Sequence, residues 1–522
     1  MALSQEKRTL GSARKQNKVI LPLEAVFAVV FTLWVVVCVA FYSSNPSGTE
    51  ALLSDENRPG DATAVFKPEL RKQQTSMRAG RQRPDVRVTQ PPARENRRPP
   101  KARAPNEKFP EHYMTFSTAC SESQNWQSFM FFYYAHKVQQ PGHVVRIASG
   151  CSDSQKKELV KFHQDVISKL SDKFSVHFTP DFSRISGDNY KYYNKPYGVQ
   201  HWLTHGLKYE DNRDEYEDAI IMILDPDMIL LRPLTYDFED TNVMIHKSKR
   251  GAPSTMRVMH GQPWASLYAF GTGPFRVDVK YVFANHTDSP AFKLTSEEQA
   301  NNYPGGPPYM ATGRDMFAIV TTWCELVPRV HKVYEHLLGE MYGWSLAAAH
   351  LGLPHTLAES FMVSAVDIGS GEGWRLIDDL GDDEICEFST LKEKEDKLPY
   401  TMHYCQNYWL GKWFIGKYRL DSDFLNCEKP LLLEPPTGIH DKYDFYIKPG
   451  GNPYGTRERL RKQSAKREEF MICGMIKRLN DAATWIKSVT CEEGTANLKK
   501  EFIFHHSLDP NNNEGGEKKA KW

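Results

Sequence analysis

A run of apolar residues that ends in two carboxylates constrains the fold of this chain most strongly. Residues 219–224 read Ala-Ile-Ile-Met-Ile-Leu, and Asp225, Pro226 and Asp227 follow directly. A short, unbroken apolar run bounded by turn residues predicts a strand that is buried on both faces. Pro226 cannot donate a backbone hydrogen bond, so we expect the strand to end before it. The two carboxylates would then lie at the carboxyl edge of an α/β sheet, where such sheets place their ligands.

Two interpretations of this Asp-x-Asp pattern are open. Hard oxygen ligands at such an edge suit Mg²⁺ or Mn²⁺ that bridges a diphosphate. An exposed acidic turn after a core strand explains an isolated pattern of this kind more often. The surrounding sequence therefore has to decide between a metal site and a turn.

The N-terminal part of the chain predicts a membrane anchor. Residues 25–42 carry no charge, residues 20–23 lengthen the apolar run, and basic residues precede it. About 18–20 apolar residues suffice to span a bilayer, and the positive-inside rule keeps the N-terminus cytoplasmic. A cleaved signal peptide is the alternative, but the apolar region is long and no small-x-small site follows. We expect a cytoplasmic tail (1–18), a transmembrane anchor (19–42), a disordered Arg- and Pro-rich stem (43–108), a luminal domain (109–436) and a C-terminal extension (437–522).

Cysteine usage agrees with a luminal location. Cys38 falls in the expected anchor, and the other eight cysteines follow it, which permits up to four disulfides whose pairing the sequence does not show. Asn285 begins a usable N-glycosylation sequon. Lys and Arg (66) balance Asp and Glu (65), so composition does not indicate a nucleic-acid partner. These features describe a resident of the secretory pathway.

Strands and helices alternate through the first part of the luminal domain. We expect strands at 113–120, 144–151, 174–179 and 218–224, and helices at 126–137, 156–173 and 195–207. This alternation predicts a parallel or mixed sheet of Rossmann type. No Gly-x-Gly-x-x-Gly motif follows the first strand, so we do not expect a nicotinamide cofactor.

The second half of the domain holds further candidate residues. Loops expected around Tyr268 and at 303–309 are rich in Gly, Pro and aromatic residues, which suits sugar stacking or ordinary turns. Asp315 precedes an apolar stretch, and Glu340 opens a helix at 340–351, where a helix-dipole role is the simpler explanation. In the C-terminal extension, beyond the domain, one amphipathic helix is expected at 468–487.

The segment 402–418 is the last informative stretch. A histidine beside apolar residues is usually a core residue, but His403 could also complete a metal's coordination. Lys412 or Lys417 could meet a phosphate as a point charge.

Several motifs together resemble the hydroxyproline O-arabinosyltransferase family and, more distantly, the peptidyl serine α-galactosyltransferases. The resemblance covers roughly residues 113–436, and this chain has Asp225 where the plant motif has Glu. It implies a type II Golgi membrane enzyme with a GT-A-like fold that transfers a sugar with retention from a UDP-sugar to a hydroxyl group of a secreted or cell-wall glycoprotein. The matching motifs are Trp126-Gln127, Asn194-Lys195-Pro196, Asp225-Pro226-Asp227 with Pro233, Glu340-Met341-Tyr342, and His403-Tyr404-Cys405 before Gly411.

The expected site follows from these motifs. Asp225, Asp227 and His403 would hold Mn²⁺ or Mg²⁺. The donor would be bound by Lys195, Gly411 and Lys412, and Glu340 and Asp315 are the carboxylates nominated for the reaction. L-Arabinofuranose and hydroxyproline are the expected sugar and acceptor. A peptidyl serine O-α-galactosyltransferase and a non-catalytic, membrane-tethered carbohydrate-binding protein are the alternatives.

Overall fold

The computed structural model describes residues 110–239, 241–246, 255–368, 371–387, 397–448 and 456–502. The tail, anchor and stem expected at 1–108 lie outside these residues, as does the end of the C-terminal extension. Within the described ranges, no helix combines the length and the apolar character needed to cross a membrane.

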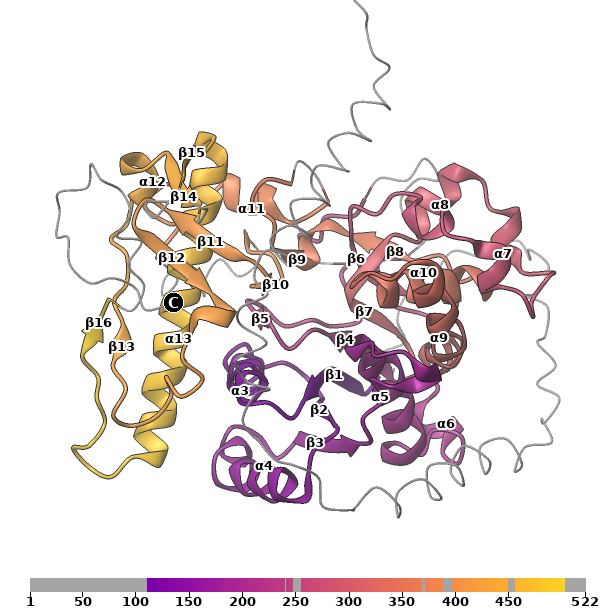
Figure 1. The fold of residues 1–522 in the computed structure, drawn as a ribbon, viewed down its shortest axis with the longest axis horizontal. Helices are drawn as coiled ribbons and strands as arrows, with labels where there is room; N and C mark the ends of the chain where they lie inside the picture. Colours follow the sequence, from indigo (N-terminus) through magenta and orange to yellow (C-terminus); the bar gives the residue numbers. More distant parts are fainter. Residues whose placement is uncertain are drawn as a thin grey trace, which may run out of the picture. The chain divides into compact units, whose positions relative to one another are not determined.

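A seven-stranded mixed sheet forms the centre of the molecule (Figure 1). Its order is β3-β2-β1-β4-β7-β6-β8, and only β7 runs against its neighbours β4 and β6. The mixed α/β sheet predicted from the alternating pattern is therefore confirmed. The strands are β1 (His112–Ala119), β2 (His143–Ser149), β3 (Phe174–Thr179), β4 (Ile220–Leu224), β6 (Trp264–Leu267), β7 (Gly305–Thr312) and β8 (Thr356–Ala358).

Helices cover both faces of this sheet, which explains why β4 is apolar throughout. Ile220 and Met222 pack into one hydrophobic core with α3 (Glu122–Lys137). Ile221 and Ile223 point to the other face and pack into a second core. That core is built with α5 (Asn194–His201), α9 (Gly313–Val333) and α10 (Gly339–His350). Alternate residues of one strand thus enter two cores, and a polar residue fits at neither.

Two predicted helices end earlier than expected. The helix predicted at 156–173 is α4 (Asp153–Asp165), followed by a short 3-10 turn at Ile167–Lys169. Ser152 and Gln155 form a capping box that fixes its start. The helix predicted at 195–207 is α5 followed by a π-helical turn at Trp202–Gly206. Pro196 lies in the first turn of α5, where its missing N–H has no helical partner to lose.

The stretch at 303–309, expected as a loop, is mostly strand β7. Ala265 pairs with Tyr309 and Ser266 with Gly306, so Pro307 and Pro308 form a bulge opposite β6. A bulge interrupts the ladder, and proline is tolerated where no ladder hydrogen bond is needed. The loop prediction was wrong because Gly and Pro mark both turns and bulges.

The remaining elements include a smaller sheet, a hairpin and a long C-terminal helix. The smaller sheet has the order β5-β10-β9. The other elements are β5 (Met228–Leu230), α6 (Arg213–Tyr216), α7 (Val279–Val282), α8 (Ser296–Asn302), β9 (Met362–Val363), α11 (Trp374–Asp378), β10 (Thr401–His403), β11 (Asn407–Leu410), β12 (Trp413–Gly416), β13 (Leu431–Leu432), α12 (Ile439–Lys442), β14 (Phe445–Lys448), β15 (Thr456–Arg459), α13 (Lys462–Thr490) and β16 (Lys500–Glu501).

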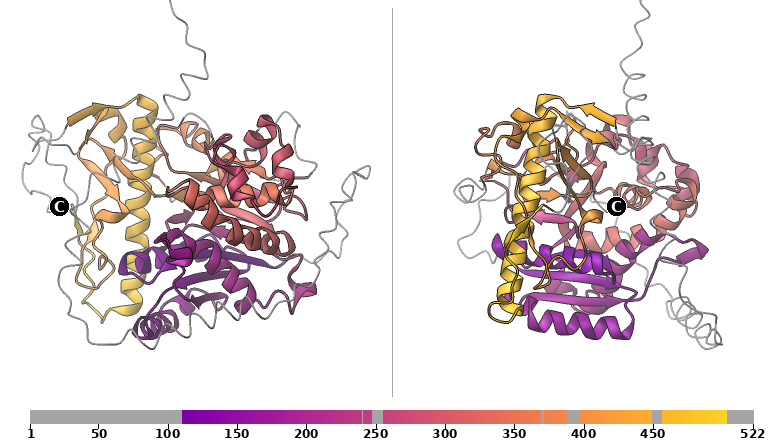
Figure 2. Two further views of the ribbon diagram at one scale, coloured as in Figure 1. Left: turned by 45° about the vertical axis from the view of Figure 1, so that its right-hand side comes forward. Right: turned by 60° about the vertical axis from the view of Figure 1, so that its left-hand side comes forward.

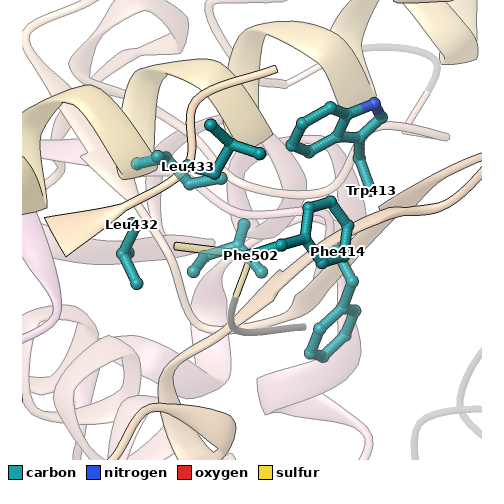
Figure 3. A pocket seen from close by; sticks show the side chains of 7 residues that line it. Trp413, Phe414, Leu432, Leu433 and Phe502 are labelled. Atoms are coloured by element: carbon teal, nitrogen blue, oxygen red, sulfur yellow. The ribbon is translucent and has the colours of Figure 1, made fainter. Parts of the chain in front are cut away.

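Helix α13 runs beside the β11–β12 hairpin and against α3 (Figure 2). It is longer than the helix predicted at 468–487. A small pocket lies between β12, β13 and α13 (Figure 3), and its lining is apolar. None of the residues predicted to bind donor, metal or acceptor lines it.

Three disulfides cross-link the described structure. Cys120–Cys151 joins the chain after β1 to the chain after β2, and Cys386–Cys473 and Cys427–Cys491 join α13 and its end to earlier segments. Cys324 and Cys405 are free. The pairing lies within the limit of four that the cysteine count allowed.

Candidate active site

Asp225 and Asp227 lie at the carboxyl edge of the central sheet. The chain order β1, β2, β3 runs outward on one side of β1, whereas β4 lies on its other side. The sheet therefore has a topological switch point between β1 and β4, where open α/β sheets form a crevice for ligands. Asp225 follows the last residue of β4, Leu224, directly. As predicted, the strand ends before Pro226.

The smaller sheet brings His403 to these carboxylates. β5 starts directly after Asp227 and pairs antiparallel with β10, so that His403 faces Met228. The backbone N–H of Tyr404 donates to the carbonyl oxygen of Asp227 at 3.0 Å, which extends the pairing by one step. Strand register, and not sequence proximity, thus places the imidazole beside the two carboxylates.

The three side chains form a compact cluster. His403 Nε2 lies 3.3 Å from Asp227 Oδ1 and 4.0 Å from Asp225 Oδ2. One ligand atom from each of the three residues lies within 4.8 Å of the others. Asp227 and His403 are buried, whereas the Asp225 side chain keeps 16% of its exposure. Asp227 and His403 are therefore enclosed by protein, and solvent reaches the cluster at Asp225.

A lysine whose side chain is 12% exposed lies on each side of the cluster. Lys195 Nζ lies 2.7 Å from Asp225 Oδ1 and 2.7 Å from Glu340 Oε1. Lys417 Nζ forms an ion pair with Asp227 Oδ2. Burial disfavours the charged form of Asp227 and would raise its pKa. The charges of Lys417 and His403 outweigh this effect and hold the pKa of Asp227 far below its usual range. Asp227 stays ionised because Lys417 and His403 lie beside it.

Glu340 is the third carboxylate of the site. It lies at the start of α10, and its Oε1 accepts from Lys195 at 2.7 Å. Burial raises the pKa of Glu340 to about 7, assisted by the charge of Asp225 and opposed by Lys195. Its Oε2 atom is buried and has no hydrogen-bond partner within the described part of the chain. Tyr190 and Trp323 hydrogen-bond to its backbone, and the ion pair with Lys195 gives the side chain a contact beyond the helix dipole.

The donor set of the cluster fits a divalent cation. Two carboxylates and one imidazole are ligands that Mn²⁺ accepts, and Mg²⁺ favours the carboxylate oxygens. His403 Nδ1 is buried and has no partner among the described residues. Lys195 and Lys417 already hold cationic charge against Asp225 and Asp227. The positions of both ammonium groups show that the carboxylates are arranged to receive positive charge.

Three of the predicted site residues lie elsewhere. Thr312 pairs with Ile220 at the first residue of β4, so Asp315, which follows Thr312 closely, lies at the opposite end of the strand from Asp225. At about 3.3 Å per residue, roughly 13–16 Å of strand separates those ends. Asp315 instead accepts from the N–H of Gly261. The geometry gives Asp315 no part in the cluster.

Gly411 and Lys412 form the turn of the β11–β12 hairpin. Leu410 pairs with Trp413 beside this turn, whereas Asn407 pairs with Gly416 at the open end. Lys417 follows the open end and returns to the cluster, while Lys412 stays at the far end. Of the two lysines weighed from the sequence, Lys417 is the one that reaches the acidic residues. Asn285, the glycosylation candidate, is exposed.

Sequence reasoning did not single out two tyrosine hydroxyls beside the cluster. Tyr309 lies on β7 opposite Ile223, and Tyr268 packs against Gly306. Both hydroxyl groups are buried and, in the ranges that the structure covers, have no hydrogen-bond partner. Burial, with the charges of Glu340 and Asp225, raises the pKa of Tyr309 well above its usual value. The aromatic stretches around them were the only signal that the sequence offered.

Two known proteins share sequence similarity with this chain. A peptidyl serine alpha-galactosyltransferase from Arabidopsis thaliana is 27% identical over 271 residues, which cover 49% of this chain and 28% of that protein. A peptidyl serine alpha-galactosyltransferase from Chlamydomonas reinhardtii is 31% identical over 121 residues, covering 23% and 14%. The matched regions thus span less than a third of either relative.

Solved structures with similar folds include two glycosyltransferases. The apo structure of the bifunctional glycosyltransferase WbbM matches with a TM-score of 0.32 and 10% identity, over 58% of this chain and 47% of that chain. The galactosyltransferase LgtC, in complex with donor and acceptor sugar analogues, matches with a TM-score of 0.29 and 10% identity, over 56% and 87%. No protein-family model matches the chain.

Proposed function

We propose that this chain is a metal-dependent glycosyltransferase with a GT-A-like fold that moves a sugar from a UDP-sugar to a hydroxyl group of a protein. The observation that carries the proposal is the Asp225–Asp227–His403 cluster at the switch point of the sheet. An exposed acidic turn would not recruit a buried histidine from another sheet and an ion-paired lysine on each side. The similarity to two peptidyl serine alpha-galactosyltransferases supports the same reaction class.

The residues of the cluster have separate roles when the diphosphate leaves the sugar. Asp225, Asp227 and His403 would hold Mn²⁺ or Mg²⁺, which acts as a Lewis acid on the leaving UDP when bound. Lys195 and Lys417 supply fixed positive charge where negative charge develops on the diphosphate. Removal of such a preorganised group costs on the order of 100-fold in rate.

Glu340 is the carboxylate that we assign to the sugar side of the site. Its Oε2 atom is buried and has no partner among the residues that the structure describes, so it can accept a hydrogen bond from a sugar hydroxyl or stabilise positive charge on the sugar ring. Retention at the anomeric carbon needs either a carboxylate nucleophile or attack from the leaving-group face. Asp315 lies at the other end of β4 and takes no part in this proposal.

The acceptor and the donor sugar are ranked by the comparisons. Serine and galactose come first because both relatives are named for them. Hydroxyproline and L-arabinofuranose, expected from the sequence motifs, come second. We also propose a luminal, single-pass type II location in the Golgi, which the three disulfides support because such bonds persist in oxidising compartments.

Transfer assays with each combination of donor and acceptor test this function. The purified protein is incubated with serine and hydroxyproline peptides, with UDP-galactose and UDP-arabinofuranose, and with Mn²⁺ or EDTA. We expect transfer only with Mn²⁺, and a loss of at least about 100-fold in Asp225→Asn. Asp218→Asn is the matched control, because Asp218 is exposed and precedes β4 at its opposite end.

The outcomes separate the alternatives. Transfer to serine peptides selects the galactosyltransferase, and transfer to hydroxyproline peptides selects the arabinosyltransferase. Absence of both transfer and UDP-sugar hydrolysis with every donor would overturn the enzymatic proposal and favour a carbohydrate-binding protein. Full activity of Asp225→Asn in EDTA would overturn the metal assignment.

A further inference from the structure

A second group of potential metal ligands lies far along the chain from the first. His440 is on α12, Asp441 follows it, and Asp382 lies in the loop after α11. One ligand atom from each lies within 4.8 Å of the others. Helices α11 and α12 both pack against α13 (Figure 1). The group therefore lies where the loop, α12 and α13 meet.

His440 is oriented as metal-bound histidines are. Its side chain is 0% exposed, and its Nδ1 atom is hydrogen-bonded to the equally buried carboxylate of Glu469 on α13. A metal-bound histidine almost always donates its second ring N–H to such a carboxylate, which fixes the ring and its tautomer. Glu469 is itself held by the backbone N–H groups of Gly438 and His440 at 2.8 and 2.9 Å. With Nδ1 used in this way, Nε2 carries the free lone pair.

The free nitrogen points at the two carboxylates. His440 Nε2 lies 3.6 Å from Asp382 Oδ1 and 3.8 Å from Asp441 Oδ1, and it is buried with no hydrogen-bond partner in the described structure. These distances are too long for hydrogen bonds. Tetrahedral zinc, with bonds of about 2.0–2.1 Å, separates its ligand atoms by about 3.3–3.4 Å. The two distances from His440 Nε2 are thus within about 0.5 Å of this spacing, and the two carboxylate oxygens lie within 4.8 Å of each other.

The charge of the group favours a divalent cation. Asp382, Asp441 and Glu469 carry three negative charges, and Lys466 Nζ, 3.1 Å from Asp382 Oδ1, supplies one positive charge. The charge of Lys462 also acts on Asp382, so with neutral His440 the sum is one negative charge. The side chains of Asp382 and Asp441 are 54% and 59% exposed, so an ion can enter from solvent.

The framework around the group is rigid. Cys386, which follows Asp382 in the same loop, is bonded to Cys473, one helical turn after Glu469. Lys466 also donates to the carbonyl oxygens of Asp378 and Leu380, which holds the start of the loop against α13. Preorganised ligands lose little entropy on binding an ion.

We propose that Asp382, His440 and Asp441 bind a zinc ion, with Glu469 orienting the histidine, and that this ion fastens the loop and α12 to α13. Imidazole nitrogen with carboxylate oxygen is a ligand set that zinc accepts, and the fourth position is left for water. The site is separate from the Asp225 cluster and does not depend on the proposed transferase reaction.

Metal counting tests the zinc site. The purified full chain is stripped with EDTA, loaded with Zn²⁺, desalted and analysed for metal content. We expect Asp382→Asn/Asp441→Asn and His440→Gln each to bind one equivalent less than the unmodified protein, whereas Asp227→Asn affects only the first cluster. The rise in Tm that Zn²⁺ causes should be larger in the unmodified protein, by roughly 3 °C or more, than in the double variant, which keeps only the first cluster.

The controls distinguish a loss of zinc binding from a change in the fold or in the activity of the protein. Asp379→Asn, at a 72% exposed carboxylate beside the loop, should retain the full zinc content. Both metal content and Tm are read without an activity assay, so failure of the proposed transferase leaves the test intact. Equal zinc content and equal Tm shifts in the unmodified protein and in the double variant would overturn the proposal and leave the group as a buried histidine among ion pairs.

Discussion

Lys417 and Asp227 form an ion pair whose side chains keep only 12% and 7% of their exposure. Removal of one partner from a buried pair leaves an uncompensated charge, which typically costs about 3–5 kcal/mol. We therefore expect Lys417→Met to lower the free energy of unfolding by about this amount in EDTA. Mn²⁺ should restore more stability to this variant than to the unmodified protein, because an added cation offsets the uncompensated charge of Asp227. Urea unfolding with and without Mn²⁺ measures both effects.

Lys412→Met is the matched control for this prediction. Lys412 lies in the hairpin turn, and surface substitutions away from special features usually change stability by no more than about 0.5 kcal/mol. Lys417→Met should also lower kcat/KM by on the order of 100-fold, whereas Lys412→Met should leave it nearly unchanged. The reverse ranking of the two lysines would contradict the site described above.

At the scale of single residues, some members of the site could be predicted from the sequence and others could not, and the difference has physical reasons. Asp225 and Asp227 were predictable because a buried strand and the residue that ends it are both local features. The choice between Lys412 and Lys417 was not, because it depends on the pairing register of a hairpin. The exclusion of Asp315 likewise follows from the antiparallel direction of β7, which no local pattern of residues shows.

The turn between β11 and β12 gives the first prediction at the scale of elements. Gly411 has a φ of +56°, its N–H donates to the carbonyl oxygen of Phe445 at 2.8 Å, and an added Cβ would collide with the ring of Tyr443. We expect Gly411→Ala to destabilise the protein by about 1–3 kcal/mol without changing kcat or the donor KM of the folded enzyme. Urea unfolding and steady-state kinetics give both numbers. A raised donor KM at unchanged stability would instead restore the donor-binding role expected from the sequence.

The junction of α10 and β8 gives a prediction about pH. Burial lowers the pKa of His355 to about 3, and Trp344 Nε1 donates to its Nε2 atom at 3.1 Å. The unfolded chain therefore binds a proton more readily than the folded protein between pH 6.5 and about 3. Stability from this group is fully present above pH 6.5 and is lost as the pH falls, by up to about 1.4 kcal/mol per pH unit.

Urea unfolding at pH 7 and pH 5 measures this effect. We expect His355 to account for about 2 kcal/mol of the loss between these values. His355→Gln cannot titrate, so its free energy of unfolding should fall less over the same interval. Equal losses in both proteins would show that His355 does not control the acid response.

Elements were predictable wherever one periodicity dominated. β1 to β4 and α3 follow local apolar patterns, and the structure places them within a few residues of the expected ranges. β7 was missed because its Gly-Gly-Pro-Pro segment follows turn chemistry, whereas in the structure its two prolines form a bulge opposite β6. The pairing of β5 with β10, which builds the cluster, joins segments far apart in sequence and has no local signature.

On the scale of the whole molecule, the C-terminal helix shares its core with the catalytic sheet. Phe470, Met471 and Ile472 of α13 pack in the same hydrophobic core as Met222 of β4 and Phe129 of α3. The Tyr134 hydroxyl also donates to the carbonyl oxygen of Arg478 at 3.0 Å. Two of the three disulfides connect residues on either side of position 436. The boundary expected at 436 therefore separates sequence segments that are packed into one core.

Truncation after Pro436 should consequently prevent folding of the catalytic part. Each fully buried apolar side chain contributes about 1.5–3 kcal/mol, and α13 buries Phe470, Met471, Ile472, Met475, Ile476 and Leu479. The loss of at least about 9 kcal/mol is comparable with the whole stability of a typical domain. A chain that ends at Phe502 should keep cooperative urea unfolding and near-UV circular dichroism, and a chain that ends at Pro436 should lose both. The shorter chain is made with Cys386→Ser and Cys427→Ser to remove unpaired thiols. If that chain unfolds cooperatively and still transfers sugar, α13 is an appendage and not part of the core.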